Sequence, residues 1–386
     1  MEELDWIDAA TACALLGVRR QTLYAYVSRR LLRACSDAGD PRRSLYARQD
    51  VEGLAAKHRR PRARAEVAAA AIRWGDPVLE TSISDVRDGV LRFGSRPAEV
   101  LAETMTLEQI AAHHCRVARF EVPEPWGAGF PAGATPLARA FGYLAAEAAQ
   151  APPMQGRDRA ALAEQGARLM SRVADAMLGA PDRARLPVHA RMAAAWGLDA
   201  QAAEILRRAL VLLSDHELNP STFAVRVCAS TGAGLAAALL AGLSTLTGPR
   251  HGGVATRARQ AIEAMAGGEA AVAAFLAENG ALTPYAFGYG HPLYPAGDPR
   301  AAVLLEALGP QVSAVRQVRA LADRLGLPPN VDAGLAALAA AHALPAEAAF
   351  SIFATGRLAG WIAHAIEQVE SGQIIRPRAR FIPVRD

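Results

Sequence analysis

From residue 107 onward the chain is a succession of amphipathic stretches, and this pattern limits its fold more than any other feature. Apolar residues recur three and four positions apart, which is the period of a helix that buries one face. We expect helices over residues 107–117, 136–150, 157–178, 187–196, 200–213 and 233–246. Alternation typical of strands appears near 81–84 and 89–93. The body of the protein is therefore expected to be all-α with a small β element at its start.

The composition agrees with this expectation and excludes several classes of protein. Hydrophobic residues make up 52% of the 386 residues, enough for a large core and too many for a disordered chain. A chain of this length is expected to form two or three domains. No apolar run reaches the roughly 20 residues of a membrane-spanning helix, and no basic-then-apolar leader opens the chain. We therefore expect a cytoplasmic protein without a membrane partner.

Neither the cysteines nor the glycines indicate a metal or a redox cofactor. The cysteines show no CxxC spacing, as expected of inert thiols in a reducing cytosol: Cys13, Cys35, Cys115 and Cys228. The run 113–115, His-His-Cys, is not expected to hold a metal, because adjacent helix residues point in different directions. The glycines at 232–234 lack the preceding strand and third glycine of a dinucleotide loop. No metal and no cofactor are expected.

The N-terminal residues 1–60 are expected to form a separate basic domain. Residues 1–64 carry 13 basic and 8 acidic side chains, so the net charge of +4 belongs to this end of the chain. Asp8 is a good N-cap for a helix over 9–16, and Gly17 suits its C-terminal end. A second helix is expected over 21–29, which gives a helix-turn-helix layout. An arginine-rich linker, 61–75, follows.

With a short strand and helix after the second helix, this unit resembles the MerR or excisionase type of winged helix-turn-helix, in which Tyr46, Asp50 and Val51 match. The resemblance implies DNA as a partner. Groove-reading side chains usually lie near the start of the second helix, so the candidates for DNA contact are Arg19, Arg20, Gln21, Thr22, Tyr24, Arg42 and Arg43. The alternative is a small basic domain that only docks against its neighbour.

A hexapeptide in the C-terminal part, Gly248-Pro249-Arg250-His251-Gly252-Gly253, marks a candidate site. Pro249 ends the helix expected before it, because proline lacks an N–H and clashes with the preceding turn. The glycines after His251 let the backbone approach a ligand closely. A helical pattern resumes at 257–265. The imidazole is therefore expected at a helix–loop–helix junction, where it is both fixed and reachable.

Six more motifs accompany this hexapeptide. They are Asp215-His216-Glu217-Leu218-Asn219, the run 287–294 (FGYGHPLY), Asp298-Pro299-Arg300, Pro329-Asn330-Val331-Asp332 and the run 356–364 (GRLAGWIAH), with Ile375-Arg376-Pro377-Arg378 after them. In order and rough spacing, from about residue 80 to 383, they resemble citrate synthase. That resemblance implies a two-lobed helical body over 76–386, with a small lobe at about 253–345 inserted in the large one.

The resemblance also assigns roles in a condensation of acetyl-CoA with oxaloacetate to citrate. Asp332 is the expected base, His251 the donor on the enol side and His291 the donor on the ketone side. The residue types suit these tasks, because a carboxylate in a dry site is a competent base. Preorganised donors aimed at a developing oxyanion are usually the largest single catalytic contribution.

Oxaloacetate brings two carboxylates whose burial requires cationic partners. Arginine matches a carboxylate with two parallel hydrogen bonds. The resemblance makes Arg300, Arg357 and Arg376 the expected partners, with His216 as a further contact. In this family the last arginine reaches into the neighbouring subunit's site, which implies a homodimer.

The chain also departs from the family pattern on the CoA side. Arg250 stands where a small or apolar residue is usual, Val254-Ala255 replaces Ala-Asn, and Pro292 replaces the arginine after His291. The loop from 294 to 298 lacks its usual lysine. The lost charges often help to hold CoA phosphates, and Arg250, Arg257 and Arg259 are candidates to compensate.

Two hypotheses remain open from the sequence. The first is an active enzyme that uses acetyl-CoA, or propionyl-CoA to give 2-methylcitrate, since one methylene changes binding by only about 1–3 kcal/mol. The second is a transcriptional regulator whose enzyme-like body senses a metabolite. The presence of Asp332 favours the enzyme, because a pure sensor does not need a general base.

Overall fold

A computed structural model covers the whole chain. The residues it describes are 5–28, 31–37, 40, 43–58, 79–124, 126, 130–181, 185–379 and 381. In this part of the chain, no helix is both long and apolar enough to cross a membrane. The chain divides into two compact units, one of residues 1–80 with 378–386 and one of residues 81–377. The linker expected over 61–75 lies outside the described residues, so the predicted domain boundaries stay predictions.

In its described residues, the first unit has three short strands and three helices. Its antiparallel sheet has the order β1-β3-β2, with Ile7 opposite Tyr46 and Cys35 opposite Leu45. In chain order the elements are β1 (Trp6–Asp8), α1 (Ala9–Leu16), α2 (Arg20–Ser28), β2 (Ala34–Ser36), β3 (Ser44–Ala47) and α3 (Arg48–His58).

Local chemistry explains the boundaries of α1. The Asp8 carboxylate accepts a hydrogen bond from the Thr11 N–H at 2.7 Å, which caps the helix as the sequence indicates. Gly17 ends the helix in the left-handed region (φ 64°), where a side chain would be strained. Leu23 on α2 packs with Ile7 and Leu16 into a small core. The second helix begins one residue earlier than predicted, because Arg20 already has helical geometry.

The second unit opens with a three-stranded antiparallel sheet of order β4-β5-β6, and helices form the rest of its described part. Its strands are β4 (Ser84–Arg87), β5 (Val90–Phe93) and β6 (Arg96–Pro97). Its helices are α5 (Ala98–Ala102), α6 (Leu107–Cys115), α7 (Pro136–Gln150), α8 (Arg159–Leu178), α9 (Val188–Ala195), α10 (Ala200–Leu212), α11 (Pro220–Ser230), α12 (Leu235–Leu246), α13 (Val254–Ala266), α14 (Glu269–Glu278), the 3-10 helix η1 (Pro284–Phe287), α15 (Pro299–Leu308), α16 (Ser313–Leu325), α17 (Val331–Ala341) and α18 (Ala348–Glu370).

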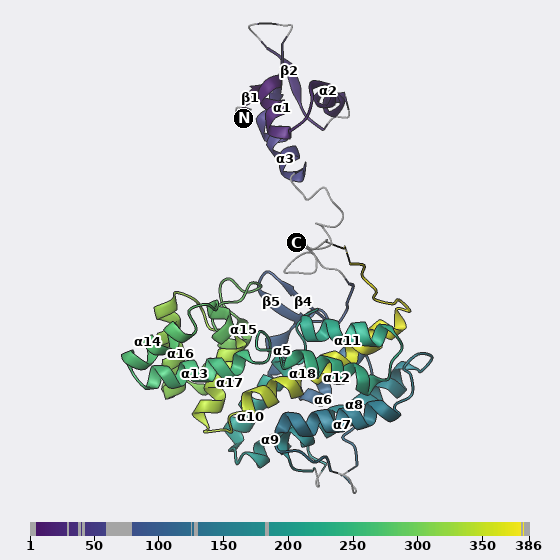
Figure 1. The fold of residues 1–386 in the computed structure, drawn as a ribbon, viewed down its shortest axis with the longest axis vertical. Helices are drawn as coiled ribbons and strands as arrows, with labels where there is room; N and C mark the ends of the chain where they lie inside the picture. Colours follow the sequence, from purple (N-terminus) through teal and green to yellow (C-terminus); the bar gives the residue numbers. More distant parts are fainter. Residues whose placement is uncertain are drawn as a thin grey trace, which may run out of the picture. The chain divides into compact units, whose positions relative to one another are not determined.

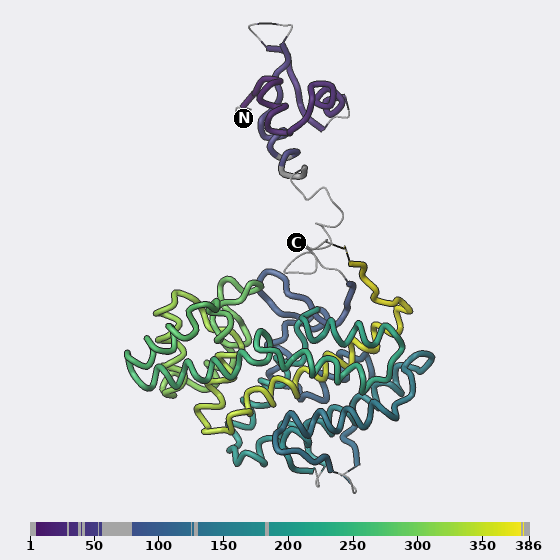
Figure 2. The backbone as a smooth tube through the Cα atoms, viewed as in Figure 1, coloured from purple at the N-terminus to yellow at the C-terminus, as the bar shows by residue number. Residues whose placement is uncertain are grey.

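Helix α18 is the axis of this unit. It runs through the middle of the body, with α13 to α17 gathered towards one end (Figure 1), and Figure 2 follows its path between the other segments. It packs against α6, α8, α10, α11, α12, α13 and α17. A helix that is surrounded on all sides is mostly apolar. Trp361 and Ile362 are fully buried in α18, and the polar side chains buried with them include Arg357 and His364.

Two glycines let α18 lie against the turn that follows α10. A Cβ at Gly360 would overlap the Ser214 carbonyl oxygen and the Asp215 carboxylate, and one at Gly356 would meet the Leu213 side chain. The Gly360 N–H donates to the Ser214 carbonyl at 2.8 Å, which also requires this close approach.

The expected helices agree closely with the observed ones, and the differences lie at the ends. Helix 136–150 matches α7 at both ends, because Thr135 caps it and Pro136 occupies its first position. The first strand is a correction: it runs over Ser84–Arg87 and pairs with β5, whereas 81–84 was expected. Helix α13 begins at Val254 and not at 257, since the chain turns directly after Gly253.

We predict that Gly360→Ala destabilises the protein by about 3 kcal/mol, because the added methyl overlaps backbone and carboxylate atoms that cannot retreat. The measurement is chemical denaturation followed by circular dichroism. Gly142→Ala on α7 is the matched control: nothing lies within 4 Å of its added Cβ, so alanine should stabilise by up to about 1 kcal/mol. Equal effects of both substitutions would contradict the close packing of α18.

Candidate active site

The three predicted catalytic side chains lie where helices begin or loops turn. His251 occupies the turn between α12 and α13, and His291 lies in the loop between η1 and α15. Asp332 is the second residue of α17. Helix ends and turns present a side chain in a fixed direction while leaving one side of it open to a ligand.

Asp332 is a buried carboxylate with an unused oxygen. Asn330 caps α17, and its side-chain oxygen accepts a hydrogen bond from the Asp332 N–H at 3.0 Å. Asp332 is 8% exposed, and its Oδ1 has no hydrogen-bond partner. Burial raises the pKa of Asp332 to about 7, against the opposing effects of Arg300 and Arg357. A carboxyl with this pKa can both take up and release a proton near neutral pH.

His251 is held through its Nε2 by a short chain of hydrogen bonds. Nε2 lies 2.9 Å from the Ser221 hydroxyl, which lies 2.7 Å from the Asn219 side-chain oxygen. The ring stands edge-on to Phe353. Burial lowers the pKa of His251 to about 4, and Arg357 adds to this effect. The imidazole is therefore neutral at pH 7.

His291 is also neutral, and its tautomer follows from its backbone contact. The Leu293 N–H can only donate, and it lies 3.1 Å from Nδ1 of His291. Nδ1 therefore accepts, and the proton of the neutral ring is on Nε2. Burial lowers the pKa of His291 to about 4, with a further contribution from Arg300. The ring contacts Tyr285 and Tyr294, at centroid distances of 5.6 and 4.8 Å.

His216 joins the same group of aromatic rings. Its centroid lies 5.3 Å from that of His291, and its Nε2 lies 2.8 Å from the Tyr294 hydroxyl. Burial holds the pKa of His216 well below its usual value. The residue follows directly after the part of the turn that packs against Gly360, so the packing of α18 fixes its position.

Arg357 is a buried cation without an acidic partner in the described residues. It is 1% exposed, and its Nε donates to the Leu213 carbonyl at 2.8 Å. Its guanidinium lies over the Phe353 ring, 5.1 Å from the centroid. Burial lowers the pKa of Arg357 to about 10, so it stays charged at pH 7. The hydrogen bond at Nε leaves both terminal nitrogens for an anionic ligand.

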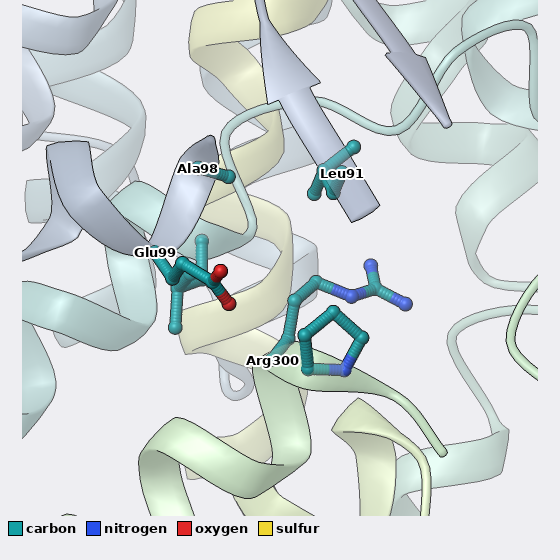
Figure 3. Close-up of a pocket in the computed structure, with 6 residues that line it drawn as sticks. Leu91, Ala98, Glu99 and Arg300 are labelled. Carbon is teal, nitrogen blue, oxygen red and sulfur yellow. The ribbon is translucent and has the colours of Figure 1, made fainter. Parts of the chain in front are cut away.

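Arg300 has a partner that directs it. Its Nε and Nη2 donate to the two oxygens of Asp298, at 3.0 and 2.8 Å. The guanidinium lies over the Tyr294 ring. Arg300 also lines a narrow crevice between β5, α5, α10 and the start of α15, which leaves no room for a water molecule (Figure 3). In that view its guanidinium extends away from Glu99, which lines the opposite part of the crevice.

The structure brings together six of the predicted site residues, each from a separate motif. His216 and His291 are in ring contact, and Tyr285 contacts His291 while interacting electrostatically with Asp332. Arg357 affects the pKa of both His251 and Asp332, which places it near both side chains. The group consists of His216, His251, His291, Arg300, Asp332 and Arg357.

Other predicted residues are not part of this group. Arg376 lies exposed in the extended segment after α18, and Arg250 is exposed beside His251. Arg257 donates to the carbonyls of Pro249 and Ala286, and Arg259 to those of Leu344 and Pro345. These two arginines therefore connect segments of the small-lobe region, and neither guanidinium is held ready for a ligand.

Sequence reasoning gave no role to four residues of the site. Ser221 and Asn219 hold His251, Asp298 directs Arg300, and Tyr285 contacts His291. Asn219-Pro220 is a recognisable helix start, yet no sequence pattern indicates which ring the following hydroxyl meets. In the described residues no group of three His, Cys, Asp or Glu side chains could hold a metal ion. His114, from the His-His-Cys run, is buried beside the Ser214 hydroxyl.

Comparison with known proteins gives one consistent family. A family model for the C-terminal domain of citrate synthase matches residues 122–378. The Haloferax volcanii citrate synthase is 33% identical over 194 residues, which are 48% of this chain and 51% of that protein. The Shewanella oneidensis 2-methylcitrate synthase is 30% identical over 191 residues, 47% of this chain and 51% of that protein. The chain thus spans about half the length of the curated relatives it matches.

The fold has the same relatives. The Thermoplasma acidophilum citrate synthase, solved as a ternary complex with carboxymethyl coenzyme A and oxaloacetate, superposes with a TM-score of 0.63 at 22% identity. The superposition covers 80% of this chain and 95% of that one. The mainly helical body therefore has a citrate-synthase-like fold. The comparisons do not bear on the N-terminal winged helix-turn-helix, which stays a prediction.

We predict that Asp332→Asn stabilises the protein more at pH 8 than at pH 5. The folded-state pKa of Asp332, about 7, lies above the usual aspartate value of 3.8, so ionising the buried carboxyl costs stability as pH rises towards 7. Asparagine resembles the protonated acid and avoids that cost. The difference in free energy of unfolding between Asp332→Asn and the wild-type protein should grow by about 2 kcal/mol from pH 5 to pH 8.

The measurement is the free energy of unfolding at several pH values for both proteins. Asp323→Asn, at an exposed position on α16, is the control and should give no such growth. A difference for Asp332→Asn that stays constant with pH would show that this carboxyl is ionised throughout the range.

Proposed function

Because this chain belongs to the citrate synthase family, we propose that it condenses acetyl-CoA with oxaloacetate to give citrate and CoA. The observation that carries the proposal is the presence in one site of a buried cation that forms no salt bridge with a described residue, Arg357, and a buried carboxyl whose pKa is about 7, Asp332. A buried cation with free terminal nitrogens favours an anionic ligand, and a carboxyl tuned to neutral pH suits proton abstraction.

Oxaloacetate would be held by its carboxylates. The terminal nitrogens of Arg357 offer two parallel donors, and Arg300 offers the nitrogen that Asp298 does not occupy. His216 lies against His291 and would add a neutral contact. Arg376 would act on the neighbouring subunit of a homodimer, which fits its exposed place after α18.

The first step would form an enol from the acetyl thioester. Asp332 takes a proton from the methyl carbon through its unpartnered Oδ1. The thioester oxygen then needs a donor, which is His251. In the structure the Ser221 hydroxyl donates its one proton to the Asn219 side-chain oxygen and accepts from Nε2 of His251. When the acetyl group binds, the hydroxyl would turn and donate to Nε2 instead, and the ring would then carry its own proton on Nδ1. That tautomer can donate to the enol oxygen without burying a charge.

The second step would join the two substrates. The enol carbon attacks the ketone carbon of oxaloacetate, and a carbon–carbon bond forms while the ketone oxygen gains negative charge. His291 carries its proton on Nε2, since Nδ1 accepts from Leu293, and can donate it to that oxygen. Water then cleaves the thioester and releases CoA. Acetyl-CoA serves as a substrate, and the chemistry needs no other cofactor or metal.

Propionyl-CoA is the alternative acyl donor. One relative is a 2-methylcitrate synthase, and an extra methylene changes pocket binding by only about 1–3 kcal/mol. A thiol-release assay with oxaloacetate and a panel of acyl-CoAs tests the function and ranks the donors. Absence of thiol release with every acyl-CoA would overturn the proposal.

We predict that Asp332→Ala lowers kcat by at least about a hundredfold, because removing a general base affects the chemical step. The affinity for oxaloacetate should change little, because Arg300, Arg357 and His216 remain. The measurements are the thiol-release assay and calorimetric titration with oxaloacetate. Asp323→Ala on α16 is the control and should keep full turnover. Loss of oxaloacetate binding together with turnover would give Asp332 a structural role.

DNA binding by the N-terminal unit is a second candidate function. A glycine turn joins α1 and α2, and Arg19, Arg20, Gln21 and Tyr24 at the start of α2 are exposed. Thr22 is half-buried, Arg43 is exposed before β3, and Arg42 lies outside the described residues. A dimer would present two such units to a two-fold DNA site. The body would then sense a metabolite or catalyse beside its operator.

We predict that Arg20→Ala weakens binding of genomic DNA fragments in a gel shift at physiological salt, because each lost phosphate or base contact costs about 1–3 kcal/mol. Arg319→Ala, at an exposed position on α16, is the control and should leave the shift unchanged. Binding that is indifferent to DNA sequence and lost steeply with salt would indicate a basic patch without specific readout.

A further inference from the structure

Asp298 makes more contacts than a helix cap requires. It is 3% exposed and caps α15, where its Oδ1 accepts from the Arg300 N–H at 3.0 Å. The same carboxylate accepts two further hydrogen bonds from the Arg300 guanidinium. Its Oδ2 also accepts from the Val331 N–H at 3.0 Å. One side chain therefore contacts both the arginine and the first residue of α17.

Other aspartate caps in this body do much less. Asp158 at the start of α8 and Asp199 at the start of α10 are exposed, and each accepts one backbone N–H through Oδ1. An aspartate can therefore cap a helix without being buried and without contacting a second helix. The burial of Asp298 would be costly unless both its oxygens were satisfied, and the groups that satisfy it belong to two different parts of the site.

We propose that Asp298 is a positioning residue. Its carboxylate directs Arg300 and holds the start of α17, so that Asp332 keeps a fixed position relative to the arginines that would bind oxaloacetate. This inference rests on the proposed condensation, since it assigns Arg300 to oxaloacetate and Asp332 to the acetyl group. The hydrogen bond to Val331 lies one residue before Asp332, so a shift of Asp298 would move the base and the arginine together.

Asp298 also affects the base through its charge. The groups that act on Asp332 are Arg300 from α15, Arg357 from α18 and Arg257 from α13, which lower its pKa against burial, and Asp298, which raises it. Tyr285 faces it from η1. Neutralising Asp298 removes the negative charge and releases Arg300 from its partner. Both changes favour the ionised form of Asp332, so its pKa should fall.

The first experiment compares Asp298→Asn with the wild-type chain across pH. Asparagine keeps one accepting oxygen for the cap but loses the charge and the second acceptor. We expect kcat to fall by about tenfold or more, because a small misplacement of reacting groups is costly. We also expect the acid limb of kcat/KM to move to lower pH by about one unit. Asp158→Asn is the matched control, an exposed cap that should change neither quantity.

A second variant separates position from charge. Val331→Pro removes the N–H that donates to Asp298 and leaves both charges in place. Proline is tolerated as the first residue of a helix, and Asn330 already has the extended backbone (φ −103°, ψ −179°) that a residue before proline adopts. We expect kcat to fall while the acid limb stays at the wild-type pH.

The outcomes distinguish the two proposals. The positioning role would be overturned if Asp298→Asn kept wild-type turnover and an unmoved acid limb of kcat/KM. It would also be overturned if kcat fell while this acid limb stayed in place, because that result indicates general damage. If Asp298→Asn does not fold, full turnover in Val331→Pro overturns it instead. A wild-type chain without turnover overturns the proposed function, and this inference with it.

Discussion

The close packing of α18 against the turn after α10 is the contact on which the site depends. Gly356 and Gly360 let the two backbones meet, and the Arg357 Nε then reaches the Leu213 carbonyl. The same turn continues through Asp215, which lies against the His364 ring on α18, into His216. One packing contact thus orients a buried cation and a buried imidazole together. Bulkier side chains at the two glycine positions would push α18 away from this turn, and Arg357 would then lose its position relative to His216.

Burial has opposite effects on the two kinds of titratable group in this site. It lowers the pKa of His251 and His291 to about 4, which keeps both rings neutral, and raises that of Asp332 to about 7. The arginines oppose burial at Asp332 and reinforce it at the histidines. One dry, cationic environment therefore yields neutral donors beside a carboxyl that exchanges its proton near pH 7, without a separate device for each.

The sequence was enough to predict the helical body, because long amphipathic stretches fix both the type and the place of an element, as at α7. It also predicted a set of candidate site residues from the order of their motifs, and the fold brings six of them together. It could not give the first strand correctly: pairing with β5 decided the register, and 81–84 alternates as well as 84–87 does. Nor could it give the roles of Ser221 and Asp298, which depend on contacts between segments 30 and 33 residues apart.

The candidate CoA contacts differ in what the fold leaves free to bind phosphate. A phosphate needs a cation that is accessible and can turn towards it. The Arg257 and Arg259 guanidinium groups already donate to backbone carbonyls on either side of α13, so recruiting either one would cost those bonds. Arg250 is exposed next to His251, and it stands where the family usually has a small or apolar residue. Of the three candidates for CoA contact, Arg250 is therefore the one that the fold leaves accessible.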